Sequence, residues 1–134
     1  MPTIKTIYLG ELRTENEHLQ SGNKVITDAP TDNQGKGEFF SPTDLLATAL
    51  GSCIMTIMGI IARDNGIDLK GTVVDITKIM ASNPRRVAEV IVEFSFPLKG
   101  YTEEEKHLVE SVAGASPVPL SVHPNLKQTM KFNW

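Results

Sequence analysis

The residue with the clearest capacity for chemistry is Cys53, the single cysteine of this 134-residue chain. It lies inside the stretch from Leu45 to Ala62, which carries no charged side chain. A cysteine thiolate is a strong nucleophile, whereas a cysteine in apolar surroundings is most often a small packing residue. The position of Cys53 therefore leaves two alternatives open, a reactive thiol and a structural one.

The histidines and the single cysteine limit the kinds of metal and disulfide site that the chain can form. The three histidines, His18, His107 and His123, show no ligand spacing, and one cysteine is too few for a structural zinc site. We therefore predict no metal and no cofactor. A single cysteine cannot form an internal disulfide, and the N-terminal residues do not resemble a signal peptide, so we expect a reduced, cytoplasmic protein. A net charge of −3 without any Lys/Arg run argues against nucleic acid as a partner.

The cysteine is positioned by a predicted helix that begins after Ser41. Ser41 can cap it, Pro42 suits the first helical position, and Asp44 adds a carboxylate in the first turn. The helix is expected to run to about Asp64, where the "DNG" sequence ends it. Leu46, Leu50, Cys53, Ile57 and Ile61 are predicted to form one apolar stripe along it. Its small and hydroxyl residues and its lack of flanking Trp or Tyr favour a core helix over a membrane span.

The rest of the chain predicts strands on both sides of this helix and two further helices. Strands are expected at residues 3–10, 12–19, 24–28, 71–82, 85–96 and 126–134. Thr102 and Glu105 form a capping box for a helix over 102–115, and Ser116 begins a short helix that Pro124 ends. The order of elements predicts one α+β domain over residues 1–134.

The central helix has no polar face, which has a consequence for assembly. A helix that is apolar all round must be covered on every side, and a chain of this length has few elements to cover it. We therefore expect a homodimer that buries the helix from both subunits.

Two segments, "SPTDLLATALGSC" and "SPVPLSVHP", resemble the OsmC family of organic hydroperoxide reductases. The resemblance implies an intertwined homodimer with strands around a long buried central helix and with active sites at the subunit interface. It also implies thiol chemistry of the peroxiredoxin type: a cysteine thiolate attacks the O–O bond of an organic peroxide, and a second cysteine captures the resulting sulfenic acid.

The resemblance assigns roles to individual residues. Cys53 matches the attacking cysteine, and Arg13 and Asp44 match the arginine and the acidic residue that activate it. The alternatives are an exposed strand arginine for Arg13 and a helix-capping carboxylate for Asp44. Ser116 stands where the family has its resolving cysteine; it is expected to cap the short helix and can still hydrogen-bond to Cys53. An external thiol or dithiol would then have to regenerate Cys53.

The leading hypothesis is therefore a thiol-dependent organic hydroperoxide reductase that acts in oxidative stress defence. The first alternative is a non-catalytic relative that binds a small apolar ligand at the dimer interface. The others are a dimer whose cysteine is structural, and acyl transfer by Cys53 with His123.

Overall fold

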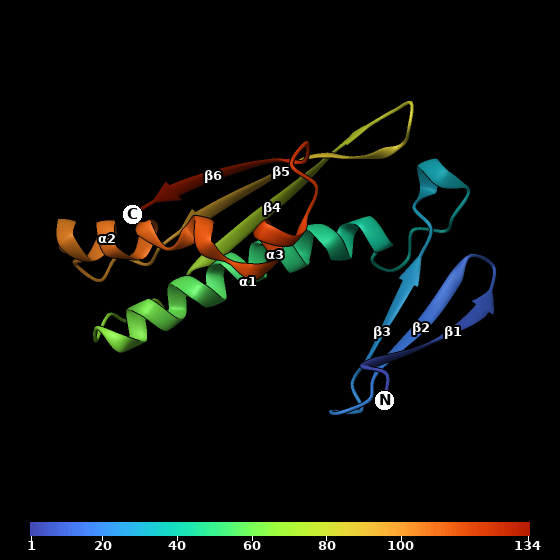
Figure 1. The fold of residues 1–134 in the computed structure, drawn as a ribbon, viewed down its shortest axis with the longest axis horizontal. Coiled ribbons are helices and arrows are strands. Elements are labelled where there is room, and N and C mark those ends of the chain that lie inside the picture. The colour runs from blue at the N-terminus through green and yellow to red at the C-terminus, as the bar shows by residue number, and fades with distance from the viewer. The chain divides into compact units, whose positions relative to one another are not determined.

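The computed structural model describes all residues, 1–134, and shows the α+β architecture that the sequence predicts. The contacts within the chain divide it into two compact units, Met1–Leu46 and Ala47–Trp134. Each unit carries its own three-stranded sheet (Figure 1). The two units are described separately below.

The first unit is an antiparallel sheet followed by a folded loop. Its strands are β1 (Ile4–Gly10), β2 (Arg13–His18) and β3 (Lys24–Asp28), with β2 in the centre. The loop contains the 3₁₀ turn η1 (Thr31–Asn33) and returns to β3, where the Asp28 amide donates to the carbonyl of Phe40 at 3.0 Å. Gly35 permits this path, because a Cβ there would lie 1.7 Å from the Ala29 carbonyl oxygen.

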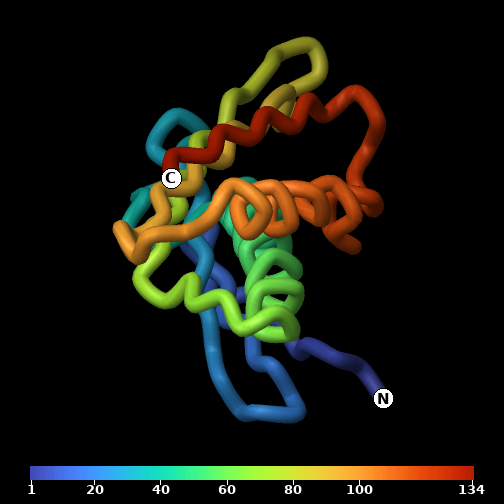
Figure 2. The backbone as a smooth tube through the Cα atoms, turned by 90° about the vertical axis from the view of Figure 1, so that its left-hand side faces the viewer, coloured from blue at the N-terminus to red at the C-terminus, as the bar shows by residue number.

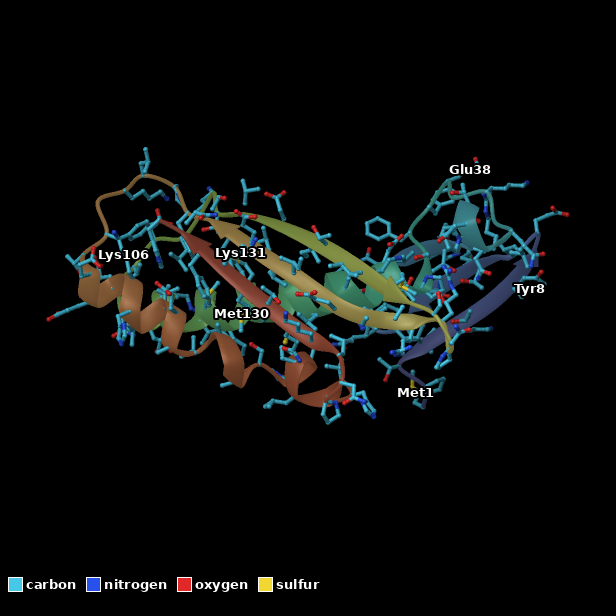
Figure 3. The ribbon with its side chains drawn as sticks, turned by 90° about the horizontal axis from the view of Figure 1, so that it is seen from above. Met1, Tyr8, Glu38, Lys106, Met130 and Lys131 are labelled. Atoms are coloured by element: carbon cyan, nitrogen blue, oxygen red, sulfur yellow. The ribbon has the colours of Figure 1, made fainter.

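The first unit buries no apolar side chain. Its buried residues are Thr27, Asp28 and Ser41, all of them polar. Large apolar side chains of the unit are exposed instead, among them Tyr8, which projects from β1 (Figure 3). The exposed set comprises Met1, Ile4, Ile7, Tyr8, Leu9, Leu12, Val25, Phe39 and Phe40. This sheet therefore has no hydrophobic core of its own.

The central helix, α1 (Pro42–Asp64), has the ends that the sequence predicts. The Asp44 amide donates to Ser41 Oγ at 3.0 Å, and the Ser41 amide donates to Asp44 Oδ2 at 2.9 Å. This reciprocal pair satisfies donors that the first turn of a helix leaves without partners. At the other end Gly66 adopts a left-handed φ of 69°, and the Ile67 amide donates to the Ala62 carbonyl at 2.8 Å.

The second unit is a sheet covered on one side by helices. The strands are β4 (Val73–Ala81), β5 (Arg86–Ser95) and β6 (Lys127–Asn133); β5 pairs antiparallel with β4 and parallel with β6. The helices α1, α2 (Glu103–Ser111) and α3 (Pro117–Ser121) lie on the same side of this sheet, with the 3₁₀ turn η2 (Ala113–Ala115) between the last two (Figures 1 and 2).

The buried face of α1 differs from the predicted stripe. Among the predicted residues only Leu50 is fully buried, while Cys53, Ile57 and Ile61 are half-buried. The residues that enter the core are Ala47, Leu50, Gly51, Ile54, Met58 and Ala62. The physical reason is close approach to the sheet: a Cβ at Gly51 would lie 2.4 Å from Ile76 Cδ1. The side of α1 that carries Gly51 faces the strands, and Cys53, two positions further along the helix, is turned away from them.

The core of the second unit follows the alternation of β5. Val90, Val92, Phe94 and Phe96 are buried, as their period of two predicts. On β6, Met130 packs against this core and Lys131 is exposed on the outer face, which Figure 3 views from above.

The last residue, Trp134, closes this core near α2. Its ring stacks on Phe96 with the centroids 3.6 Å apart, and its indole N–H donates to Glu110 Oε2 at 2.9 Å. The predicted capping box of α2 is also present, with Thr102 and Glu105 exchanging hydrogen bonds.

Length and composition alone would allow α1 to cross a membrane, and it is the one helix of the chain for which this holds. Core helices of soluble proteins pass the same test, so it is weak support for a membrane span. The buried residues of α1 share one hydrophobic core with the β4–β6 sheet, and this packing favours a core helix over a membrane span.

Candidate active site

Cys53 lies in the middle of α1 at the edge of an open pocket of about 440 Å³. The thiol is free and half-buried. Pro117 and Val118 of α3 line the facing side of the pocket, and no charged residue contributes to its wall. The α1 residues that line it are Ala49, Ser52, Cys53, Thr56 and Ile57. The arrangement gives a small uncharged molecule access to the sulfur.

Two hydroxyl groups lie beside the cysteine on α1. Thr56 Oγ1 donates to the carbonyl oxygen of Ser52 at 2.8 Å, and Ser52 Oγ donates more weakly to that of Ala49 at 3.4 Å. Such bonds to the preceding turn satisfy the hydroxyl hydrogen and leave the oxygen lone pairs available. The polar groups of the pocket are therefore hydrogen-bond acceptors.

Ser116 occupies the N-cap position of α3 and is completely buried. Its side chain makes no capping hydrogen bond, so the predicted capping role is wrong. The hydroxyl donates instead to the carbonyl of Ala113, at 3.2 Å, because η2 directly before α3 brings that oxygen within reach. Ser116 does not line the pocket, but the next residue, Pro117, does.

Arg13 is held by two carboxylates in the first unit. Its Nε and Nη2 lie 2.7 and 2.8 Å from the two oxygens of Asp28, and Nη2 also lies 3.2 Å from Glu38 Oε1. The guanidinium carbon is 4.8 Å from the centroid of the Phe39 ring. Arg13 is therefore a fixed, partly buried cation and not a solvated strand arginine.

The charges of this cluster shift one another's titration. The hydrogen bonds from Arg13 hold the pKa of Asp28 below its usual range, and the Glu38 amide, which also donates to that carboxylate, acts in the same direction. The carboxylate in turn raises the pKa of Arg13. Sequence reasoning missed Asp28 and Glu38. The partner of Arg13 across β2 and β3 is Asp28, so the register of the predicted hairpin carried a signal for this pair.

Asp44 performs the capping role that was its alternative interpretation, through the bond that it accepts from the Ser41 amide. Arg13 and Asp44 belong to the first unit, and Cys53 and Ser116 belong to the second. His123, the proposed partner in acyl transfer, does not line the Cys53 pocket, and its Nδ1 accepts a hydrogen bond from the Asn125 amide at 3.0 Å.

Comparison with known proteins places the chain in a family. The OsmC-like protein family model matches residues 35–131. A solved structure from Psychrobacter arcticus 273-4, described as a candidate osmotic stress-induced and detoxification response protein, is 50% identical over 99% of this chain and 96% of its own, with a TM-score of 0.94.

More distant structures share the fold. An organic hydroperoxide resistance protein OsmC from Legionella pneumophila is 16% identical, with a TM-score of 0.72 over 100% of this chain and 98% of its own. A candidate organic hydroperoxide resistance protein from Vibrio cholerae, with captopril in one of its active sites, is 16% identical, with a TM-score of 0.74 over 99% and 92% of the two chains. No curated protein matches the chain. The family model and the 50% identical structure together show that this chain belongs to the OsmC-like family.

Proposed function

We propose that this protein is a thiol-dependent reductase of organic hydroperoxides in which Cys53 attacks the peroxide. The observation that carries the proposal is the free thiol at the edge of an uncharged pocket between α1 and α3. Membership of the OsmC-like family and the hydroperoxide resistance named for the Legionella and Vibrio proteins support it.

The proposed reaction transfers one oxygen atom to sulfur. The Cys53 thiolate attacks the terminal oxygen of ROOH, the O–O bond breaks, and an alkoxide leaves and takes a proton from water. Sulfur loses two electrons and becomes a sulfenic acid, while the peroxide is reduced to an alcohol. The apolar side chains of Ile57, Pro117 and Val118 offer the organic group R a surface to contact.

Regeneration requires a thiol from outside the chain, because Ser116 replaces the resolving cysteine and no second cysteine exists. One external thiol condenses with the sulfenic acid to give a mixed disulfide and water. A second thiol, or the second group of a dithiol, then releases Cys53 as a thiol. A reducing, cytoplasmic location would supply such thiols.

We extend the proposal to Arg13 as the activating cation and to a homodimer with its active sites at the subunit interface. Arg13 is already oriented by Asp28 and Glu38, which is a property that a positioned cation needs. Asp44 is proposed to contribute a carboxylate at the start of α1 in addition to its capping role.

Trapping of the oxidised cysteine tests the proposed function. Treatment with an equimolar amount of cumene hydroperoxide in the presence of dimedone should add one dimedone to Cys53, as read by intact mass and peptide mapping. The Cys53→Ser variant is the control and should gain nothing. An excess of a dithiol, either dithiothreitol or dihydrolipoamide, should support continued hydroperoxide consumption. A wild-type thiol that stays reduced would contradict the proposal and leave the binding of an apolar ligand as the better hypothesis.

Two variants in the same assay test the extended site. Ser116→Cys should form a disulfide with Cys53 after oxidation, because residue 117 already lines the Cys53 pocket. Arg13→Ala should slow oxidation, whereas Arg86→Ala, which removes an arginine bound to the Ser82 and Pro84 carbonyls, should not. If the Ser116→Cys protein folds but forms no disulfide with Cys53, residue 116 does not occupy the resolving position.

A further inference from the structure

The helical neighbours of Cys53 differ sharply in chemistry. The residues three and four positions before and after a given residue of an α-helix lie on the same face as that residue. For Cys53 these neighbours are Ala49, Leu50, Thr56 and Ile57. Leu50 is buried in the core, and the other three line the Cys53 pocket. Thr56 is therefore the one polar side chain among these four neighbours. The other hydroxyl of the pocket, Ser52, directly precedes Cys53 and donates only at 3.4 Å, so its direction is less firmly held.

The Thr56 hydroxyl has a fixed direction. Its hydrogen is donated to the Ser52 carbonyl at 2.8 Å, which is a good hydrogen-bond distance. The oxygen of a hydroxyl carries two acceptor lone pairs that remain usable after it has donated. Thr56 Oγ1 can therefore accept a hydrogen bond from a molecule in the pocket that Cys53 also lines. In the proposed reaction, the sulfur of Cys53 receives an oxygen atom from that molecule.

We propose that Thr56 is a substrate-positioning residue whose Oγ1 accepts the hydrogen bond of the hydroperoxide O–H. This inference rests on the proposed function. A hydroperoxide ROOH carries its single hydrogen on the terminal oxygen, which is the atom that Cys53 attacks. A bond from this hydrogen to Thr56 places the terminal oxygen next to the sulfur and directs R towards Ile57, Pro117 and Val118.

The bond also fits the balance of the reaction. The hydrogen held by Thr56 stays on the oxygen that is transferred, so the product is the neutral sulfenic acid S–OH. The alkoxide that leaves takes its proton from water, as in the proposed function. Thr56 neither gives nor accepts a proton. It therefore favours hydroperoxides, which have an O–H donor, over peroxides with two organic substituents.

Substitutions of Thr56 test this role. Thr56→Val keeps the branched shape and removes the acceptor, while Thr56→Ser keeps the hydroxyl. The loss of one neutral hydrogen bond should slow the oxidation of Cys53 by cumene hydroperoxide about five-fold in Thr56→Val. Thr56→Ser should restore the wild-type rate. Single-turnover oxidation, followed by dimedone trapping and mass spectrometry, measures these rates.

A second reagent separates substrate positioning from a general effect on the thiol. Iodoacetamide alkylates the same sulfur and has no peroxide O–H, so its rate should be the same in wild type and Thr56→Val. A Thr56→Val protein oxidised at the wild-type rate, or slowed equally with both reagents, would overturn the role of Thr56 alone. A wild-type Cys53 that alkylates but never forms a sulfenic acid would overturn the proposed function, and the inference with it.

Discussion

The pairing of Arg13 with Asp28 shows how one buried carboxylate organises the first unit. Asp28 is only 1% exposed, yet both of its oxygens accept bonds from Arg13, and one of them also accepts the Glu38 amide. A buried carboxylate without such partners would be costly, so the charge and its hydrogen bonds belong together. The pair fixes the loop that follows β3 and, in the proposed mechanism, the cation that activates Cys53.

This pair predicts a specific loss of stability in acid. Because Arg13 holds the pKa of Asp28 below its unfolded value of about 3.9, the stabilisation is complete above that pH and disappears as the pH falls through the folded value. The free energy of unfolding of the wild type, measured with urea, should therefore decrease from about pH 4 downwards. Asp28→Asn should be less stable at neutral pH and should lose less on acidification.

Asp68 provides the matched control for this experiment. Its pKa is also lowered, chiefly by the hydrogen bond from Lys99, but its side chain is 69% exposed. Solvent screens such exposed pairs, so Asp68→Asn should change the acid dependence far less. If the free energy of unfolding falls equally steeply with pH below about pH 4 in wild type and Asp28→Asn, the structural role of this carboxylate is contradicted.

At the scale of elements, the sequence determined the ends of α1 better than its faces. Ser41, Pro42 and Asp44 are local signals, and local hydrogen bonds realise them. A helix that is apolar all round has no polar side that would indicate its orientation. Which side of α1 faces the sheet therefore depends on packing, above all on the close approach of Ile76 to Gly51. In the candidate site, the motif predicts a role for Cys53 that remains a prediction, whereas the pairing of Arg13 with Asp28 depends on strand register.

Two glycines of α1 make this argument testable. A Cβ at Gly51 would lie 2.4 and 2.8 Å from Ile76 side-chain carbons, while one at Gly59 meets no atom within 4 Å. Gly51→Ala should lower the free energy of unfolding by about 1–3 kcal/mol through overpacking. Gly59→Ala should raise it by roughly 0.5–1 kcal/mol, because alanine favours the helix. Denaturant unfolding of both variants measures the difference, and similar effects at the two sites would show that α1 does not pack as described.

For the whole molecule, the exposed apolar side chains of the first unit are the strongest sign of assembly. Fully burying a large apolar side chain stabilises a protein by about 1.5–3 kcal/mol, and this unit buries none. The pocket side of α1 likewise leaves Ile60 exposed. As a member of the OsmC-like family the chain is expected to be soluble, so a second copy is the partner that we expect to cover these surfaces.

Light scattering at low micromolar concentration tests this expectation. The wild type should have the mass of a dimer, and Ile7→Glu should shift it towards monomer, because β1 then carries a charge where an apolar contact is expected. Leu98→Glu is the control: Leu98 is 95% exposed in the segment after β5, so its substitution should leave the mass unchanged. A compact wild-type monomer would remove the basis for active sites at an interface.

The position of Trp134 decides what intrinsic fluorescence can report. It is the only tryptophan, and it is stacked on Phe96 and bonded to Glu110, all within the second unit. Its emission will therefore follow the packing of β5, β6 and α2, and carries little information about the β1–β3 sheet. Fluorescence and far-ultraviolet circular dichroism, recorded on the same denaturant series, consequently distinguish a chain whose two sheets melt together from one whose N-terminal sheet is lost first.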